Sequence, residues 1–211
     1  MYISRYMIRE PLTATPEMPL PEARRLLNEN HFRHLPVVDK HGQLVGMITD
    51  RDLRSAFPSS MLTETERLHA YERVEKATVV DIMSTECVGL TPESTLDDAL
   101  LLFNREGVGA LPVLDDGRLV GIFSGGDLLA AYKELFGVGE KGSVLLGIED
   151  DGQSNLMTRI VTLLEQHEIP FTRLLRIHDE EHGNRIYLRL NTYKIASVVN
   201  LLREAGIYPA L

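Results

Sequence analysis

The chain has 211 residues, of which 44% are hydrophobic and 25% charged, so it can bury the core of one large or two small domains. Its formal charge of −9 argues against a nucleic-acid partner, because phosphate binding needs clustered Lys and Arg. No apolar run reaches the ~18 residues of a membrane span, the first residues lack the apolar core of a signal peptide, and the single Cys87 has no intramolecular disulfide partner. These features predict a cytoplasmic protein with no membrane partner.

One sequence unit occurs twice, in residues 7–53 and 83–128. Its landmarks recur at an offset of 76 residues, which becomes 75 after a one-residue deletion in a turn. The matching positions are Leu35-Pro36-Val37 and Leu111-Pro112-Val113, Gly46 and Gly121, Thr49 and Ser124, and Asp52 and Asp127. Duplicated units pack around a pseudo-twofold axis and form two related grooves, so the repeat favours paired binding clefts over a single catalytic centre.

Both units have the pattern of a β-α-β-β-α fold: an extended piece, a helix with apolar residues at helical spacing, a hairpin with a Gly turn, and a second helix. The expected elements of the first unit are the extended piece 12–15, a helix over 20–27, strands over 35–39 and 43–48, and a helix from Asp50 to Ser55. Those of the second are 88–91, a helix over 96–103, strands over 111–114 and 118–123, and a helix over 126–136. Pro19 and Pro21 suit the start of the first helix, and Ser94 or Thr95 can cap its counterpart.

A charged segment separates the two units. Pro58-Ser59-Ser60 breaks the chain, and Thr63 with Glu66 forms the pattern of a capping box before an expected helix over 63–76. This helix is either a solvated face or a contact for a partner or second subunit.

The composition changes after Phe136. Gly137, Gly139 and Gly142 mark a short linker. The expected elements beyond it are a strand over 143–148, a helix over 155–167, two strands flanking a turn over 179–184, a helix over 193–205 and a strand over 207–211. This β-α-β-β-α-β order predicts a ferredoxin-like half-open sandwich, so the fold class is α/β (α+β) throughout.

The two units resemble a tandem pair of cystathionine-β-synthase (CBS) domains, also called a Bateman module. The matching strings are Leu35–Asp39 with Gly46–Leu53, and Leu111–Asp115 with Gly121–Leu128. The resemblance implies that an adenine nucleotide (AMP, ADP or ATP) or another adenosyl compound binds in the clefts between the repeats. It divides the chain into a first CBS repeat (1–58), a linker helix (59–80), a second CBS repeat (81–136), a Gly-rich linker (137–142) and a tail (143–211).

The chemistry of such a cleft follows from Thr49 and Asp52, which recur as Ser124 and Asp127. A carboxylate can accept both hydrogen bonds of a ribose diol, and a hydroxyl with the first N–H groups of a helix can receive a phosphate. The same spacing is also that of a helix cap, and both roles can coexist.

The family resemblance implies how each groove is assembled, with the hydroxyl and carboxylate of one repeat facing the other repeat. One groove would join Ser124 and Asp127 to Thr13, Ala14, Arg33 and His34. The other would join Thr49 and Asp52 to Val88, Gly89, Gly109 and Ala110, with Arg51 as the nearest basic side chain. A guanidinium pairs well with phosphate oxygens, although Arg33 also reads as a solvated helix-end residue and His34 as a packed histidine.

The tail resembles an ACT domain, a small ligand-sensing module common in amino-acid metabolism. Its best motif is Asp150-Asp151-Gly152, although Gln153-Ser154-Asn155 lengthens the approach to the helix, and Gly152 also fits a tight turn. A CBS pair with such a tail resembles acetoin-utilization regulatory proteins. The tail strand over 186–190 would suit pairing with another subunit.

Catalysis finds little support in the sequence. Cys87 has no His partner by spacing, His31, His34 and His41 match no zinc pattern, and neither a phosphate-binding loop nor a nucleophile elbow is present. We therefore expect a non-catalytic regulatory sensor, without catalytic cofactor or metal, that forms a homodimer and contacts a regulated protein partner. The alternative is a structural interaction module with unoccupied clefts; an enzyme that uses the cleft is a third, weaker hypothesis.

Overall fold

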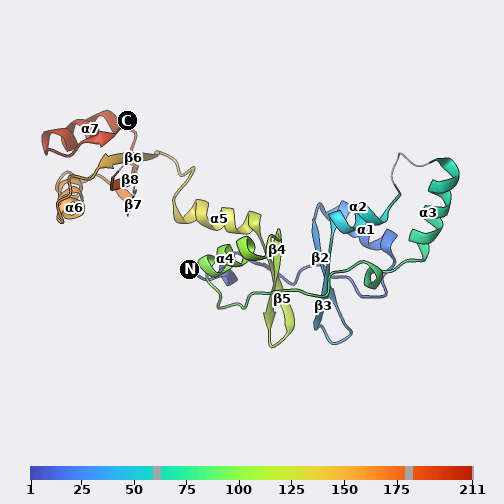
Figure 1. Ribbon diagram of the computed structural model, residues 1–211. Coiled ribbons are helices and arrows are strands. Elements are labelled where there is room, and N and C mark those ends of the chain that lie inside the picture. Colours follow the sequence, from blue (N-terminus) through green and yellow to red (C-terminus); the bar gives the residue numbers. More distant parts are fainter. Residues whose placement is uncertain (59–62, 179–182, 211) are drawn as a thin grey trace. The chain divides into compact units, whose positions relative to one another are not determined.

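The computed structural model describes residues 1–58, 63–178 and 183–210, and it divides into two compact units, Met1–Ala131 and Tyr132–Leu211 (Figure 1). Three sequence-based expectations lie outside the described residues: the chain break at Ser59 and Ser60, the middle of the turn at 179–182, and the last residue of the terminal strand, Leu211. Each unit is considered by itself.

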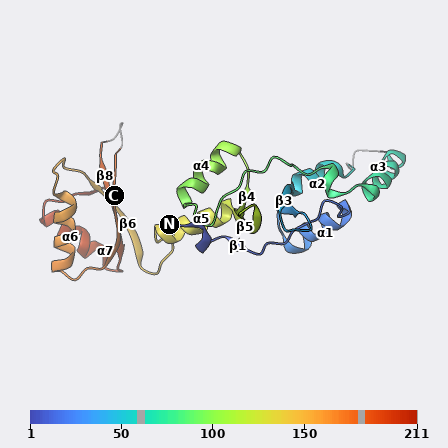
Figure 2. The same ribbon diagram turned by 90° about the horizontal axis from the view of Figure 1, so that it is seen from below.

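The first unit contains both repeats. Its helices and strands are η1 (Ile3–Arg5), β1 (Ile8–Arg9), α1 (Leu20–Asn30), β2 (His34–Val38), β3 (Leu44–Thr49), α2 (Asp50–Ala56), α3 (Glu64–Lys76), η2 (Val79–Asp81), α4 (Leu96–Glu106), β4 (Ala110–Asp115), β5 (Arg118–Ser124) and α5 (Gly125–Leu135), the last of which runs past the unit boundary. The hairpins β2–β3 and β4–β5 lie side by side, with α1 and α2 outside the first and α4 and α5 outside the second (Figures 1 and 2). The repeated order is confirmed except for its first strand, because Ala14 and Leu90 each form only a single bridge, to Val37 and Val113.

Local sequence explains where the first helix of each repeat begins. Pro19 is the N-cap of α1 and Pro21 lies in its first turn, where a missing N–H costs little. Thr95 caps α4, accepting a hydrogen bond from Asp98 N at 3.2 Å while Asp98 Oδ2 accepts one from Thr95 N at 2.8 Å. α1 buries Leu20, Ala23 and Leu27, and α4 buries Leu96 and Ala99, as the spacing predicts. Leu100, which the spacing also assigned to the buried face of α4, is instead 39% exposed.

The segment before each repeat packs on the other repeat. Ile3 N donates to Ser94 O at 2.9 Å, and β1 pairs antiparallel with β5 through Ile8 and Ile122. In the equivalent way, the segment after η2 bonds to the first repeat, with Met47 N donating to Ser84 O at 2.9 Å. The two repeats therefore exchange their leading segments and form one unit.

The hairpins also meet directly. Their turns are joined by hydrogen bonds from Leu44 N to Gly117 O at 3.4 Å and from Leu119 N to Gly42 O at 3.2 Å. Met47, Ala110 and Ile122 form a small buried cluster that takes residues from both repeats. The interface between the repeats is thus a packed contact that fixes the walls of any cleft beside it.

The segment between the repeats forms α3, and the capping box of Thr63 and Glu66 is confirmed, with Glu66 Oε2 accepting from Thr63 N at 2.9 Å. The helix is not wholly solvated, because Val74 packs in the core of the first repeat. Leu68 and Tyr71, on the outer side, are 60% and 43% exposed.

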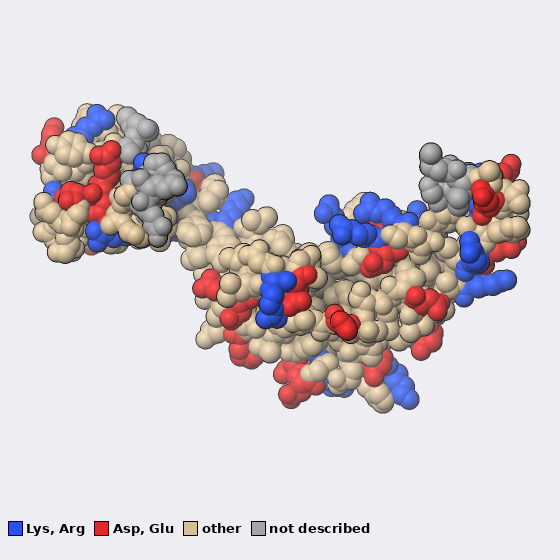
Figure 3. All heavy atoms as spheres, in the orientation of Figure 1, with Lys and Arg blue, Asp and Glu red and all other residues tan. Residues whose placement is uncertain are grey.

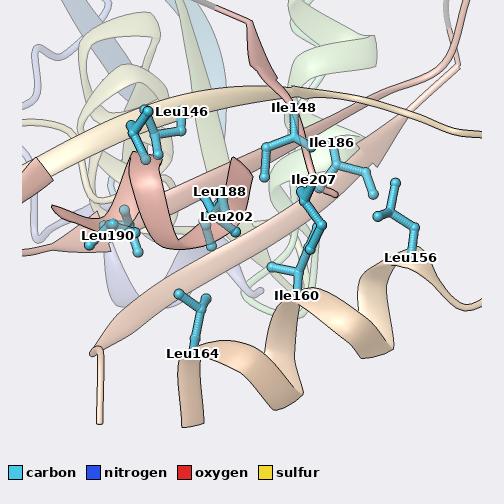
Figure 4. Packing of buried hydrophobic residues seen from close by; sticks show 12 residues of the cluster. Leu146, Ile148, Leu156, Ile160, Leu164, Ile186, Leu188, Leu190, Leu202 and Ile207 are labelled. Atoms are coloured by element: carbon cyan, nitrogen blue, oxygen red, sulfur yellow. The ribbon is translucent and has the colours of Figure 1, made fainter. Parts of the chain in front are cut away.

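The second unit has the β-α-β-β-α-β order expected from the sequence. Its elements are β6 (Ser143–Glu149), α6 (Leu156–Gln166), β7 (Phe171–Ile177), β8 (Arg185–Asn191), α7 (Ile195–Glu204) and β9 (Pro209–Ala210). The sheet order is β7-β8-β6-β9 with all pairs antiparallel, which is the ferredoxin-like arrangement. The expectation that the strand over 186–190 pairs with another subunit is wrong, because it lies in β8, which is hydrogen-bonded to β7 on one side and β6 on the other. Alternate residues of β6 and β8 pack against α6 and α7 in a core made largely of Leu and Ile (Figure 4).

Candidate functional site: a cavity between the repeats

A cavity of about 620 Å³ opens in the first unit between the two repeats, a size typical of small-molecule sites. The first repeat contributes the end of the β2–β3 hairpin and the start of α2, and the second contributes the segments around Val88 and Gly109. Eight of the sequence-predicted site residues line it: Arg33, His34, Thr49, Arg51, Asp52, Val88, Gly109 and Ala110.

Thr49 and Asp52 form a capping box at the start of α2. Asp52 Oδ2 accepts hydrogen bonds from Thr49 N at 2.8 Å and Thr49 Oγ1 at 2.6 Å, and Thr49 Oγ1 accepts one from Asp52 N at 3.3 Å. Both roles weighed for this pair are compatible with the geometry: the cap uses Oδ2, and within the described residues no hydrogen bond involves Oδ1. Asp52 therefore keeps one carboxylate oxygen for a ligand hydroxyl.

Arg33 and His34 lie on this same cavity wall. The β2–β3 register sets His34 opposite Thr49, and Asp50 N donates to Arg33 O at 3.0 Å. Burial lowers the pKa of His34 from its ordinary 6.5, and the charge of Arg33 lowers it further, whereas Asp52 opposes the shift. The family resemblance implied that Arg33 and His34 join Ser124 and Asp127. In the structure, Arg33 and His34 instead line one cavity with Thr49 and Asp52, because the neighbouring strands of one hairpin end together.

The second repeat supplies a backbone floor. A Cβ at Gly109 would lie 2.9 Å from Cε1 of the His34 ring, so only glycine lets the imidazole approach this backbone. Val88 is 41% exposed beside it. Gly109 and Ala110 leave an uncluttered surface on which a flat ring can lie.

Gly89 has a packing role. A Cβ there would meet Pro112 O at 2.9 Å, because the segment runs close to β4, and Gly89 does not line the cavity. Thr13, Ala14, Ser124 and Asp127 also lie off this cavity. Ser124 and Asp127 repeat the capping box, with Asp127 Oδ2 accepting from Ser124 N at 2.8 Å and from Ser124 Oγ at 2.6 Å.

The cavity is polar and mixed in charge. Arg54 pairs with Asp50 at 2.6 Å and Arg105 pairs with Glu106 at 2.7 Å, so two of the lining carboxylates are matched by cations. Figure 3 shows Lys and Arg side chains gathered over α2. Because α2 has only seven residues and carries two Asp in its first turn, its dipole adds little, and anion attraction rests on guanidinium groups.

Several lining residues were missed by sequence reasoning. They are Met47, Asp50, Arg54, Ser84, Glu86, Cys87, Glu106, Gly107, Val108, Leu111 and Pro112. Residues 84–87 reach the cavity because the segment after η2 crosses to the first repeat, and no local pattern reports that crossing. Cys87 is half-buried against Met47 and Ala110, and burial raises the pKa of its thiol, as fits the expected packing role.

The acidic motif of the second unit is engaged within the chain. Asp150 accepts a hydrogen bond from Arg176 at 2.6 Å, Asp151 accepts one from Arg159 at 2.8 Å, and Gly152 has a φ of +77°. The tight-turn interpretation of Gly152 is therefore the one the geometry matches. Within the described ranges, no group of three or more His, Cys, Asp or Glu side chains could hold a metal ion, and no helix is long and apolar enough to cross a membrane.

The CBS-domain family model matches residues 3–59 and 79–134, which together make up more than half of the chain. The chain belongs to the CBS-domain family. It carries the two domains in tandem. A CBS domain-containing protein of Dictyostelium discoideum is 38% identical over 128 residues, covering 60% of this chain and 88% of that protein.

Two similar solved structures hold adenosine compounds. CBSX2 of Arabidopsis thaliana, in complex with AMP, is 25% identical with a TM-score of 0.54 and aligns over 64% of this chain and 98% of that one. The CBS domain pair of protein MJ0100, in complex with 5′-methylthioadenosine and S-adenosyl-L-methionine, is 26% identical with a TM-score of 0.53, over 64% and 98%.

The acetoin link and the ACT assignment stay predictions. A Vibrio cholerae structure named as an acetoin utilization protein, AcuB, is 24% identical with a TM-score of 0.55 over 66% of this chain and 96% of that one, which shows the fold alone. The CBS match ends at residue 134, before β6 begins.

Proposed function

We propose that this CBS pair is a non-catalytic regulatory sensor that binds an adenine nucleotide or another adenosyl compound in the cavity between its repeats. The carrying observation is the cavity itself, which Asp52, Gly109 and Ala110 all line, and where Oδ1 of Asp52 accepts no hydrogen bond from the described part of the chain. A ribose diol would donate to the carboxylate, and the base would lie on the backbone floor. The adenosine ligands of CBSX2 and the MJ0100 pair support this ligand class.

Calorimetric titration with AMP, ADP, ATP, NAD and S-adenosylmethionine tests the proposal. Asp52→Asn keeps an acceptor for the helix cap but removes the charge that strengthens a ribose contact, so binding should weaken by about 1.5–3 kcal/mol. Asp98→Asn is the matched control, because Asp98 forms the same capping box with Thr95, at 2.8 Å and 2.7 Å, away from the cavity. Equal affinity of parent and Asp52→Asn for every ligand would refute the ribose contact.

The alternative is an interaction module whose clefts stay empty, and binding of no ligand in the panel would favour it. Exposed leucines support both the interaction-module alternative and the expected homodimer. Leu101 on α4 and Leu129 on α5 are 68% and 72% exposed. We infer that these helices meet a second copy. The acetoin and ACT assignments rest on the family resemblances, and the cytoplasmic assignment rests on the composition of the chain. Light scattering at micromolar concentration tests the assembly; a strict monomer would end the dimer claim.

A further inference from the structure

In the second unit, α6 and α7 cover the same face of the sheet. Both helices pack in one core with alternate residues of β6 and β8, such as Leu146 and Leu188 (Figure 4). Because side chains alternate across a strand, the residues between these buried positions point to the opposite face. We call this side the open face. It carries the exposed side chains of Leu145, Leu175 and Ile177.

The strand register arranges the open face in rows. Paired residues of neighbouring antiparallel strands lie on the same side of a sheet, so each row follows from the pairing. In sheet order from β7 to β9, the row at one end consists of Ile177, Arg185, Glu149 and Tyr208, and the next consists of Leu175, Tyr187 and Gly147.

A third row is engaged by the second unit's own chain. Arg173 of β7 donates hydrogen bonds to Leu135 O and Glu134 O, both at 2.8 Å. Arg189 of β8, which is paired with Arg173, donates to Ser143 Oγ at 2.9 Å. The segment that begins at Tyr132 therefore occupies this end of the open face, and the other two rows are the part that remains for a partner.

The first row is complementary to its own reverse. Its side chains run apolar, basic, acidic, apolar, with exposed Ile177 and Tyr208 at the two ends. Arg185 and Glu149, between them, form no ion pair with any side chain in the described part of the chain. A twofold axis parallel to the strands, between β8 and β6, lays this row on the same row of a second copy in reverse order.

That axis matches charge and size together. Arg185 meets Glu149 of the second copy, and Ile177 meets Tyr208. In the second row, the ring of Tyr187 lies over Gly147 of the second copy, which has no side chain to obstruct it. A second copy is thus the occupant that the open face fits, because each row supplies its own complement.

We propose that the second unit forms a homodimer in which the open faces of two copies pack against each other, with Arg185 on Glu149 of the second copy near the axis. Sheets packed in this way lie about 10 Å apart with their strands within about 30° of each other, so the contacts nearest the axis match best. This contact is separate from the helix contact inferred above and does not depend on nucleotide binding.

Light scattering of the full chain over a concentration series tests the contact. Leu129→Asp removes the helix contact and provides the background, and this variant should remain a dimer. Adding Arg185→Glu should raise the dimer dissociation constant about 10-fold or more, because like charges then face each other at both symmetric positions. Arg203→Glu is the matched control, because Arg203 is an exposed arginine of α7, on the helix side of the sheet.

A mixing experiment separates a contact between chains from an effect within one chain. Arg185→Glu and Glu149→Arg each place like charges across the proposed contact and on neighbouring strands of the same chain. Urea unfolding checks that each variant folds, as expected for one like-charged pair on a sheet surface. Mixed in equal amounts in the Leu129→Asp background, the two variants should form a heterodimer, because each new carboxylate meets a new guanidinium.

Four results would each overturn the proposal. They are a monomeric Leu129→Asp chain, an Arg185→Glu variant that associates as tightly as its background, equal weakening by Arg203→Glu, and no heterodimer in the mixture. If a different protein occupies the open face, the Leu129→Asp chain is monomeric. A dimeric parent with a monomeric Leu129→Asp variant leaves the helix contact standing alone, whereas a monomeric parent removes both contacts.

Discussion

Replacement of Ile3 by alanine tests whether the first residues of the chain belong to the core of the second repeat. Ile3 is fully buried, and its N–H donates to Ser94 O at 2.9 Å, more than 90 positions along the chain. If this segment were a loose N-terminal tail, shortening its side chain would cost almost nothing.

The expected cost follows from burial. Ile→Ala removes three carbon atoms, worth about 2.4 kcal/mol at about 0.8 kcal/mol per buried carbon. The residual cavity adds to this, within the range of about 2–5 kcal/mol seen for such changes. Ile8→Ala is the matched control, because Ile8 lies in the same segment but is 45% exposed, so its loss should be about half the transfer term.

Urea unfolding measures the change in stability, and hydrogen exchange locates it. Ile3→Ala should raise amide exchange in β4 and β5, which are distant in sequence but receive the segment, more than in β6 and β8 of the second unit. Equal stability of Ile3→Ala and Ile8→Ala, or an exchange increase confined to the first few residues, would contradict the exchange of leading segments between the repeats.

Three further predictions concern single residues. Gly46→Ala should destabilise by about 1–3 kcal/mol, because its Cβ would lie 2.7 Å from Met83 Sδ and 3.0 Å from Ser84 O, whereas Gly126→Ala should be neutral or stabilising in urea unfolding. The lowered pKa of His34 means that the unfolded chain binds its proton more readily, so stability should fall as pH drops below 6.5, and His34→Gln should flatten that part of the melting-temperature profile. The hydrogen bond from Arg176 lowers the pKa of Asp150 from 3.8, so the stability lost in Arg176→Ala should be complete at neutral pH and should vanish as acid protonates Asp150; a gap that persists through that acid range would show that the arginine acts by packing alone.

The repeated order of helices and strands was readable from sequence because its signals are local. Pro19 and Thr95 mark helix starts, Gly42 and Gly117 with φ of +78° mark the hairpin turns, and apolar spacing marks the buried faces. The extended pieces over 12–15 and 88–91 were harder to predict, since an extended segment forms a strand only where a neighbouring strand supplies several consecutive hydrogen-bond partners. Here each segment forms a single bridge, at Ala14 and at Leu90.

The candidate site was predictable in part for the same reason. Thr49 and Asp52 recur as Ser124 and Asp127, which pointed to a cleft, and the family resemblance implied that Thr49 and Asp52 face Gly109 and Ala110. The sequence did not predict which cavity Arg33 and His34 line, because residues at the end of a hairpin can face either repeat, and only the packing of both hairpins decides between them. Gly89 is small because Pro112 O lies where its Cβ would be, a constraint set by the approach of two segments.

The sequence by itself determined the duplication, the helix caps, the turn glycines and the β-α-β-β-α-β order of the second unit, since each depends on residues within a few positions of one another. Only the tertiary structure decided that residues 1–9 pair with the second repeat, that residues 84–87 reach the first, and that Arg33 and Arg51 share one cavity wall. Because the two repeats share one sequence pattern, either repeat offers an equivalent surface for each of these segments. The choice between them depends on how whole hairpins pack, as Met47, Ala110 and Ile122 do, and side-chain packing across a repeat interface leaves no periodic trace in the chain.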